Sequence, residues 1–131
     1  MKFRTIKLEV DEAVTTEYGT AINIRPPRQD KQLGDRGFQG ILSTLTLRMS
    51  GVTTDMSTIT ARLTEDEDGD KVTMPDATCG LSRGLTTNDY TTSVYKYEVQ
   101  FIDDYPINLF VKSDNSSATL KEVILQYRTS R

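Results

Sequence analysis

The stretch ILSTLTLRM, residues 41–49, determines the fold class that the sequence predicts. Its apolar and polar side chains alternate, which is the two-residue period of a β-strand with one buried and one solvated face. Threonine, the main polar residue in it, has a branched β-carbon that favours the extended backbone. The predicted buried face comprises Ile41, Leu45, Leu47 and Met49, with Ser43 as a polar interruption, and the solvated face comprises Thr44, Thr46 and Arg48.

The same alternation recurs in both directions from this stretch, and no segment shows the apolar stripe of an amphipathic helix. Clusters of turn-forming residues separate the alternating runs. Within the acidic run 65–70, Asp68-Gly69 predicts a tight hairpin because glycine accepts a positive φ at little cost. Eight or nine strands are predicted, near residues 2–10, 19–25, 40–50, 57–64, 71–75, 78–83, 93–102, 107–113 and 118–128.

Short strands with frequent turns predict an all-β protein, a single antiparallel β-sandwich that is jelly-roll-like and has about eight strands. The length of 131 residues suits one domain spanning residues 1–131. An immunoglobulin-like sandwich is the competing topology, which the absence of tryptophan and of a cysteine pair weakens. Residues 25–40 contain two prolines, three glycines and six charges, and they are predicted to form a long loop.

The composition excludes several kinds of chemistry. There is no histidine and a single cysteine, Cys79, so histidine-based catalysis, an internal disulfide and a Cys/His zinc site are excluded. Cys79 is expected to be a buried thiol that acts as a small hydrophobe. No glycine-rich phosphate-binding motif is present. We therefore expect that the protein is not an enzyme and has no catalytic residue, no metal and no cofactor.

Two acidic segments and a set of tyrosines are the candidate sites for metal binding, catalysis or sugar binding. The run 65–70 lacks the glycine and glutamate spacing of an EF-hand, which favours a solvated hairpin tip over a calcium site. The pair at 103–104 precedes Tyr105-Pro106, and the expected role of both aspartates is turn formation rather than glycoside hydrolysis. The tyrosines that could stack on sugar rings are Tyr90, Tyr95, Tyr97 and Tyr105, although Tyr95 and Tyr97 are placed as alternating core positions.

The charge distribution narrows the choice of partner. A net charge of −3 and a pI near 5.0 argue against nucleic acid, and the sequence has no apolar run of membrane-spanning length and no secretion signal. Residues 1–50 carry a net charge of +2 and the remainder −5, which is compatible with docking of the first third on an acidic protein surface. The alternative for the loop 25–40 is a solvated connector between the two sheets that binds no partner. The predicted partner-binding residues are Arg25, Arg28, Lys31, Arg36 and Phe38.

The C-terminal half resembles small virion proteins of tailed bacteriophages, in particular β-sandwich capsid decoration (cement) proteins and related head-surface proteins. The resemblance lies in residues 63–70, 94–99 and 109–125, where a strand and a short Asp/Ser/Gly turn lead into a second strand of the pattern Ala-Thr-Leu-x-Glu-Val. It implies a non-enzymatic structural protein that is made in the host cytoplasm, binds the major capsid protein or another virion protein, and stabilises the capsid from its surface. It also implies a homo-oligomer, with a trimer favoured.

Two other functions stay open at this point. One is a virion fibre or tail component, and the other is a carbohydrate- or receptor-binding β-sandwich module. A small β-fold hydrolase is a third, which the absence of histidine disfavours.

Overall fold

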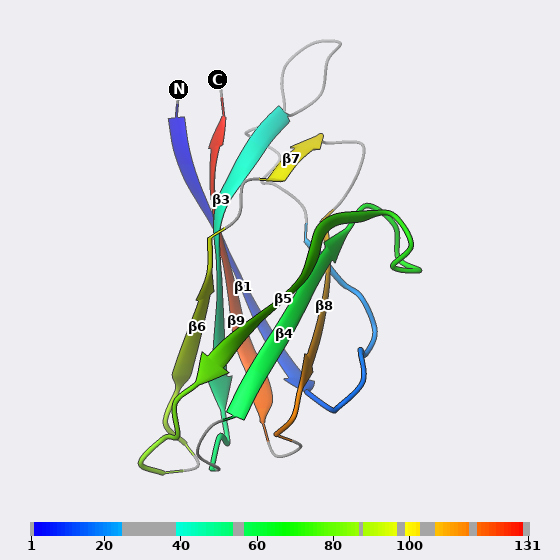
Figure 1. Cartoon of the computed structure of the whole chain (residues 1–131). Helices are drawn as coiled ribbons and strands as arrows, with labels where there is room; N and C mark the ends of the chain where they lie inside the picture. Colours follow the sequence, from blue (N-terminus) through cyan, green and yellow to red (C-terminus); the bar gives the residue numbers. More distant parts are fainter. Residues whose placement is uncertain are drawn as a thin grey trace.

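The computed structural model describes residues 2–24, 39–53, 57–86, 88–96, 99–102, 107–115 and 118–129. Within these residues the chain forms two antiparallel β-sheets (Figure 1), and none of their elements is a helix that could cross a membrane. The larger sheet has the order β1 (Lys2–Ala13), β9 (Thr119–Thr129), β3 (Gln39–Ser50) and β6 (Thr91–Tyr95), and β7 (Val99–Ile102) also pairs with β3. The smaller sheet has the order β2 (Ile22–Ile24), β8 (Ile107–Ser113), β4 (Ser57–Thr64) and β5 (Val72–Leu81).

The strand order is that of a jelly roll. β6 pairs with residues 45–49 of β3 and β7 with residues 39–42, so these two strands share one position at the sheet edge. With that position counted once, the larger sheet holds the first, last, third and sixth strands, and the smaller sheet the second, seventh, fourth and fifth. The chain thus passes repeatedly between the sheets, as in an eight-stranded jelly roll. The predicted all-β, jelly-roll-like sandwich of about eight strands is confirmed.

The core fills the space between the two sheets. Leu45, Leu47 and Met49 of β3 are at most 1% exposed, as their alternation predicted. β9 contributes a second row of buried side chains from the same sheet, and β4 and β8 face them from the smaller sheet. These residues are Val123, Leu125 and Tyr127 of β9, Ile59, Ala61 and Leu63 of β4, and Leu109 and Val111 of β8.

Hydrogen bonds between side chain and backbone join the two sheets at one side. The buried Tyr95 hydroxyl of β6 donates to the carbonyl of Ile59 in β4 at 2.7 Å. The Ser93 hydroxyl of β6 donates to the carbonyl of Gly80 in β5 at 3.2 Å. Because β5 and β6 are edge strands of different sheets, these bonds close the sandwich along that side.

A bulge in β3 explains the one polar interruption in its apolar face. The pairing of β3 with β9 shifts between Leu42 and Thr44, which leaves Ser43 as an extra residue. The Ser43 hydroxyl donates to the carbonyl of Gln126 at 3.0 Å. Since an extra residue changes the phase of the alternation, Leu42 is buried at 1% exposure, although the sequence did not place it on the apolar face.

Two strand boundaries were wrong. Residues 71–75 and 78–83, predicted as separate strands, belong largely to the single strand β5, in which Pro75 and Asp76 lie opposite Arg62 in an irregular register. A proline is tolerated there because β5 is an edge strand. The predicted strand 93–102 is divided into β6 and β7. Of the predicted loop 25–40, the last two residues belong to β3.

Candidate functional site

The predicted partner-binding residues lie outside the part of the chain that the structure describes. Arg25, Arg28, Lys31, Arg36 and Phe38 all fall within residues 25–38. Asp103, Asp104, Tyr97 and Tyr105 also lie outside the described part of the chain. Three clusters of polar and aromatic side chains are described, one at a hairpin and one on the outer face of each sheet.

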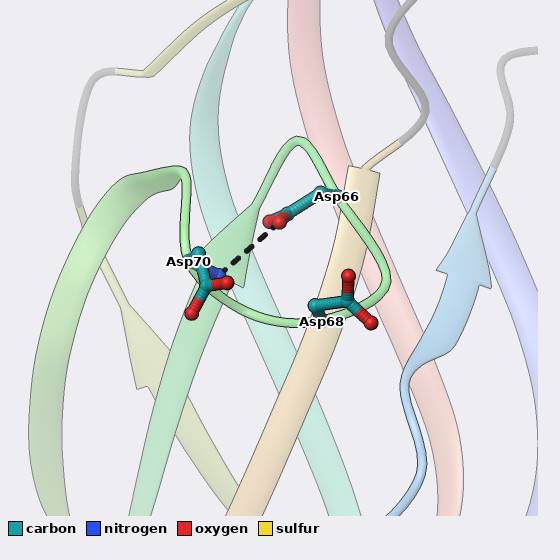
Figure 2. A group of neighbouring side chains, drawn as sticks. All are labelled: Asp66, Asp68 and Asp70. Atoms are coloured by element: carbon teal, nitrogen blue, oxygen red, sulfur yellow. Dashed lines mark hydrogen bonds between the residues drawn. The ribbon is translucent and has the colours of Figure 1, made fainter.

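The acidic run forms the tip of the hairpin between β4 and β5, as predicted. Gly69 has a φ of 83°, the positive value that the Asp68-Gly69 pair indicated. Carboxylate oxygens of Asp66, Asp68 and Asp70 lie within 4.8 Å of one another. Figure 2 shows that the Asp66 carboxylate faces the backbone nitrogen of Asp70, which donates to it at 3.3 Å. The nitrogen of Lys71 donates to its other oxygen at 2.9 Å.

These contacts give Asp66 a structural role in the turn, which the sequence analysis did not assign. Calcium is bound by six to eight oxygen atoms, whereas both oxygens of Asp66 already accept hydrogen bonds from backbone nitrogens of the turn. Asp68 and Asp70 are exposed to solvent. The geometry is that of a solvated hairpin tip held by one aspartate.

The second group, which we call the Tyr18 cluster, lies on the outer face of the smaller sheet and comprises Tyr18, Arg62, Asp76, Phe110 and Lys112. Arg62 makes a bidentate ion pair with Asp76, with N–O distances of 2.6 and 3.2 Å. The Arg62 guanidinium lies 4.8 Å from the centre of the Tyr18 ring, and the Lys112 ammonium lies 4.7 Å from it. The ring of Phe110 meets that of Tyr18 edge to face at 6.2 Å.

The Tyr18 cluster explains why Phe110 is only 8% exposed. In the sequence, Phe110 stands on the same side of the alternation as the polar residues Asn108 and Lys112, which favours an exposed position. In the structure, Tyr18 from the connection between β1 and β2 covers one part of the ring, and Gly69 of the hairpin approaches another part so closely that an added Cβ would lie 3.4 Å from it. A phenylalanine on the polar side of a strand is the sequence feature from which a segment covering this face could have been inferred.

The pKa shifts of Asp76 and Tyr18 are those expected of groups with a structural role. The hydrogen bonds from Arg62 hold the pKa of Asp76 below its usual value. Burial, with a smaller contribution from Asp76, raises the pKa of Tyr18 to about 12. Both shifts keep each group in its ordinary protonation state at neutral pH, so neither group is prepared to transfer a proton.

Replacing Asp76 by asparagine is expected to lower stability at pH 7 and to have little effect near pH 2. The reason is that the folded pKa of Asp76 is lowered, so its contribution is present above the unfolded pKa and is lost as the pH falls through the folded pKa. Urea unfolding of the parent and Asp76→Asn proteins across this pH range measures the difference. A difference that stayed constant down to pH 2 would contradict the assignment.

The third group, the Glu122 cluster, lies on the outer face of the larger sheet. Glu122 of β9 is 8% exposed and pairs with Arg48 of β3 at 2.9 Å and with Lys7 of β1 at 3.6 Å. The Arg48 guanidinium also lies 4.5 Å from the centre of the Tyr90 ring. The cluster joins three neighbouring strands, and no local sequence pattern indicates it because the three positions are distant in the chain.

Cys79 is half-buried rather than fully buried, which corrects the sequence expectation. Its sulfur lies 3.6 Å from the carbonyl of Val94, and the side chain packs against the core. Its position on the edge strand β5 accounts for the partial exposure. Tyr95, by contrast, is buried at 4% exposure, as predicted.

An open hollow of about 480 Å³ lies beside the connection between β5 and β6. Arg83, Asp89 and Tyr90 are among its lining residues, and Leu85 at its rim is 97% exposed. The Asp89 carboxylate accepts a hydrogen bond from the backbone nitrogen of Thr86 at 2.8 Å, which assigns it to the loop. Among the residues that line the hollow, Arg83 is the one cation.

No protein family and no curated protein matches this chain. Among solved structures, a chain in the X-ray structure of tomato aspermy virus is similar over 98% of this chain and 79% of its own length, with a TM-score of 0.53 and 11% identity. The C-terminal CBM6 of LamC, a marine laminarinase from Zobellia galactanivorans, matches over 93% of this chain and 98% of its own, with a TM-score of 0.48 and 13% identity. A chain of infectious bursal disease virus, strain Gt, covers 98% of this chain and 32% of its own, at 0.40 and 10%. At these identities the likeness concerns the fold.

Proposed function

We propose that this chain is a structural protein of a virus particle that binds the major capsid protein and stabilises the shell from its outer surface. The observation that carries the proposal is the jelly-roll topology of the chain, 98% of which is similar in structure to a chain of tomato aspermy virus. Jelly rolls recur in viral capsids and in lectins, so the fold alone leaves a choice between them. The resemblance of residues 109–125 to capsid decoration proteins of tailed bacteriophages favours the virion role and a site at the capsid surface.

The chemistry of the described side chains supports a binding role without catalysis. Asp76 and Glu122 each pair with an arginine, and Asp66 caps a turn. These groups stabilise the sandwich, which suits a rigid protein that binds and stabilises a capsid surface. Many copies bound around one shell act together, so the contact of each copy can be weak.

The proposed contact to the shell is the basic segment 25–38, which connects β2 to β3. Arginine pairs bidentately with carboxylates, and Phe38 offers an apolar anchor beside Arg36. An acidic region of the capsid protein is the complementary surface. The remaining, net acidic part of the chain then faces solvent.

The glycan-binding alternative has less support in the described residues. Sugar rings stack on exposed aromatic faces. The Tyr18 ring contacts Arg62 and Lys112, and Tyr90, which is 47% exposed, has the Arg48 guanidinium 4.5 Å from the centre of its ring. Tyr95 is buried in the core. A glycan array showing selective binding by the purified protein would favour this alternative.

The proposal is tested on particles that carry the protein and on particles from which its gene has been deleted. We expect electron microscopy to place the chain on the outer shell at hundreds of copies, whereas a fibre or tail component would be present at only a few. Changing Arg25, Arg28 and Arg36 together to glutamate is expected to abolish most of the occupancy, because the contact would then be repulsive. The matched control is Lys71→Glu on the exposed hairpin, which is expected to leave occupancy unchanged.

The two experiments test the virion role and the contact through residues 25–38 separately. A chain missing from purified particles contradicts the virion role itself. A chain present at full occupancy after the triple substitution contradicts only the contact through residues 25–38.

A further inference from the structure

β1 is the long open edge of the sandwich. It has 12 residues without proline or glycine, and in the described part of the chain it pairs with β9 alone. The other three edges differ from it. β2 has three residues, whereas β5 contains Pro75 and is joined by hydrogen bonds to β6. An unpaired strand edge presents backbone N–H and C=O groups that can extend the sheet with another strand.

The inward side of β1 is incompletely covered. Ile6, Leu8 and Val10 point toward the core but are only partly buried, whereas the corresponding side chains of β9 are at most 1% exposed. The reason is that the smaller sheet ends on this side in the three-residue strand β2. β1 therefore carries an apolar row that further contact would bury.

The charges on β1 are divided along its length. Arg4 and Lys7 lie in the N-terminal half, and Glu9, Asp11 and Glu12 lie in the C-terminal half. Two such strands placed parallel would bring like charges together. Placed antiparallel, they bring the basic half of each strand beside the acidic half of the other, which is the pattern of a self-complementary interface.

From these features we infer that two copies of this chain associate through antiparallel pairing of their β1 strands, about a two-fold axis at Leu8. In this register Lys7 lies opposite Glu9 of the second copy on the outer face, twice in each dimer. On the inner face Leu8 lies opposite Leu8, and Ile6 opposite Val10. The two larger sheets then form one continuous sheet across the pair.

Neighbouring registers are less favourable. A shift of one residue would place the inward row of one strand beside the outward row of the other, because side chains alternate between faces. A shift centred on Lys7 or on Glu9 would place two like charges directly opposite each other, which is destabilising. The charges on β1 therefore protect the edge from indiscriminate pairing and still permit this one arrangement.

The first test measures the mass of the purified full chain in solution by sedimentation equilibrium between about 1 µM and 1 mM. We expect a reversible monomer–dimer equilibrium that reaches twice the chain mass of 14.7 kDa and that weakens with added salt. A monomer at every concentration contradicts the inference. A trimer, which the resemblance to decoration proteins implied, also contradicts it.

Two charge reversals test the register. Lys7→Glu places glutamate opposite Glu9, and Glu9→Lys places lysine opposite Lys7, so each variant alone is expected to dimerise roughly tenfold more weakly. Mixed in equal amounts, the two variants place lysine opposite glutamate at both contacts, and a heterodimer of near parental affinity is expected. The matched controls Lys71→Glu and Glu67→Lys make the same charge changes on the exposed hairpin and should leave the dimer unaffected. Failure of the mixture to recover affinity contradicts the register.

Lys7 also pairs with Glu122, so the Lys7→Glu variant is checked for its fold by circular dichroism and thermal unfolding. A second measurement does not depend on it. In a Cys79→Ser background, Leu8→Cys places two thiols at the two-fold axis, and mild oxidation is expected to give a disulfide-linked dimer. Thr5→Cys, whose equivalent positions lie apart across the axis, is the control. Equal cross-linking of the two variants contradicts the pairing.

Discussion

Replacing Leu47 by alanine is expected to lower the free energy of unfolding by about 3–5 kcal/mol. Leu47 is completely buried in β3, which lies between β9 and β6 in the larger sheet and faces the core. Its removal takes away apolar contacts and leaves a cavity that strands tied on both sides cannot easily close. Urea unfolding followed by circular dichroism measures the change.

The control for this prediction is the adjacent residue. Thr46 lies on the outer face of the same strand, and Thr46→Ala is expected to cost under about 1 kcal/mol, mainly through the lower strand preference of alanine. Equal losses for the two variants would show that the chain does not bury alternate residues of β3 in this register.

Replacing Arg48 by methionine is expected to lower the free energy of unfolding by about 2 kcal/mol. The change leaves the Glu122 carboxylate, whose side chain is 11% exposed, with Lys7 at 3.6 Å as its remaining ion-pair partner on this face. Arg48 itself is 35% exposed, so solvent replaces part of the lost interaction and the effect is smaller than for a fully buried pair. The contact with the Tyr90 ring is lost as well.

A double-mutant cycle separates these contributions. Adding Glu122→Gln to Arg48→Met removes the carboxylate that has lost its closer cation, and it is expected to restore part of the stability. Arg62→Met is the matched control, because the ion pair of Arg62 with Asp76 is more exposed and its loss is expected to cost under about 1 kcal/mol. If the Glu122→Gln change restored nothing, the buried carboxylate would not be the cause of the loss.

The fold class followed from local patterns because each strand buries every second side chain. The alternation in residues 41–49, 57–64 and 122–127 gave the strands, and the frequency of turns gave the sandwich. The predictions that were wrong concern the phase of the alternation at one bulge and the continuity of one strand. A bulge at Ser43 added Leu42 to the core, and an edge position let β5 continue through Pro75.

The side-chain clusters were beyond sequence reasoning for a different reason. Arg48 and Glu122 are 74 residues apart, and they become neighbours only because β9 inserts between β1 and β3. The alternation along β8 favours an exposed Phe110, because no local pattern shows that Tyr18 covers that face. The docking role of segment 25–38 is predicted from its charge and composition, because these residues lie outside the described part of the chain.

The central place of β9 in the larger sheet has a consequence for the biogenesis of the protein. The ribosome makes this strand last among those described, yet β1 and β3 meet only through it, and Val123, Leu125 and Tyr127 complete the core. The native order of the larger sheet can therefore form only after residues 119–129 have left the ribosome. Until then the apolar rows of the earlier strands lack the strand that completes the core, and such exposed apolar surface favours aggregation.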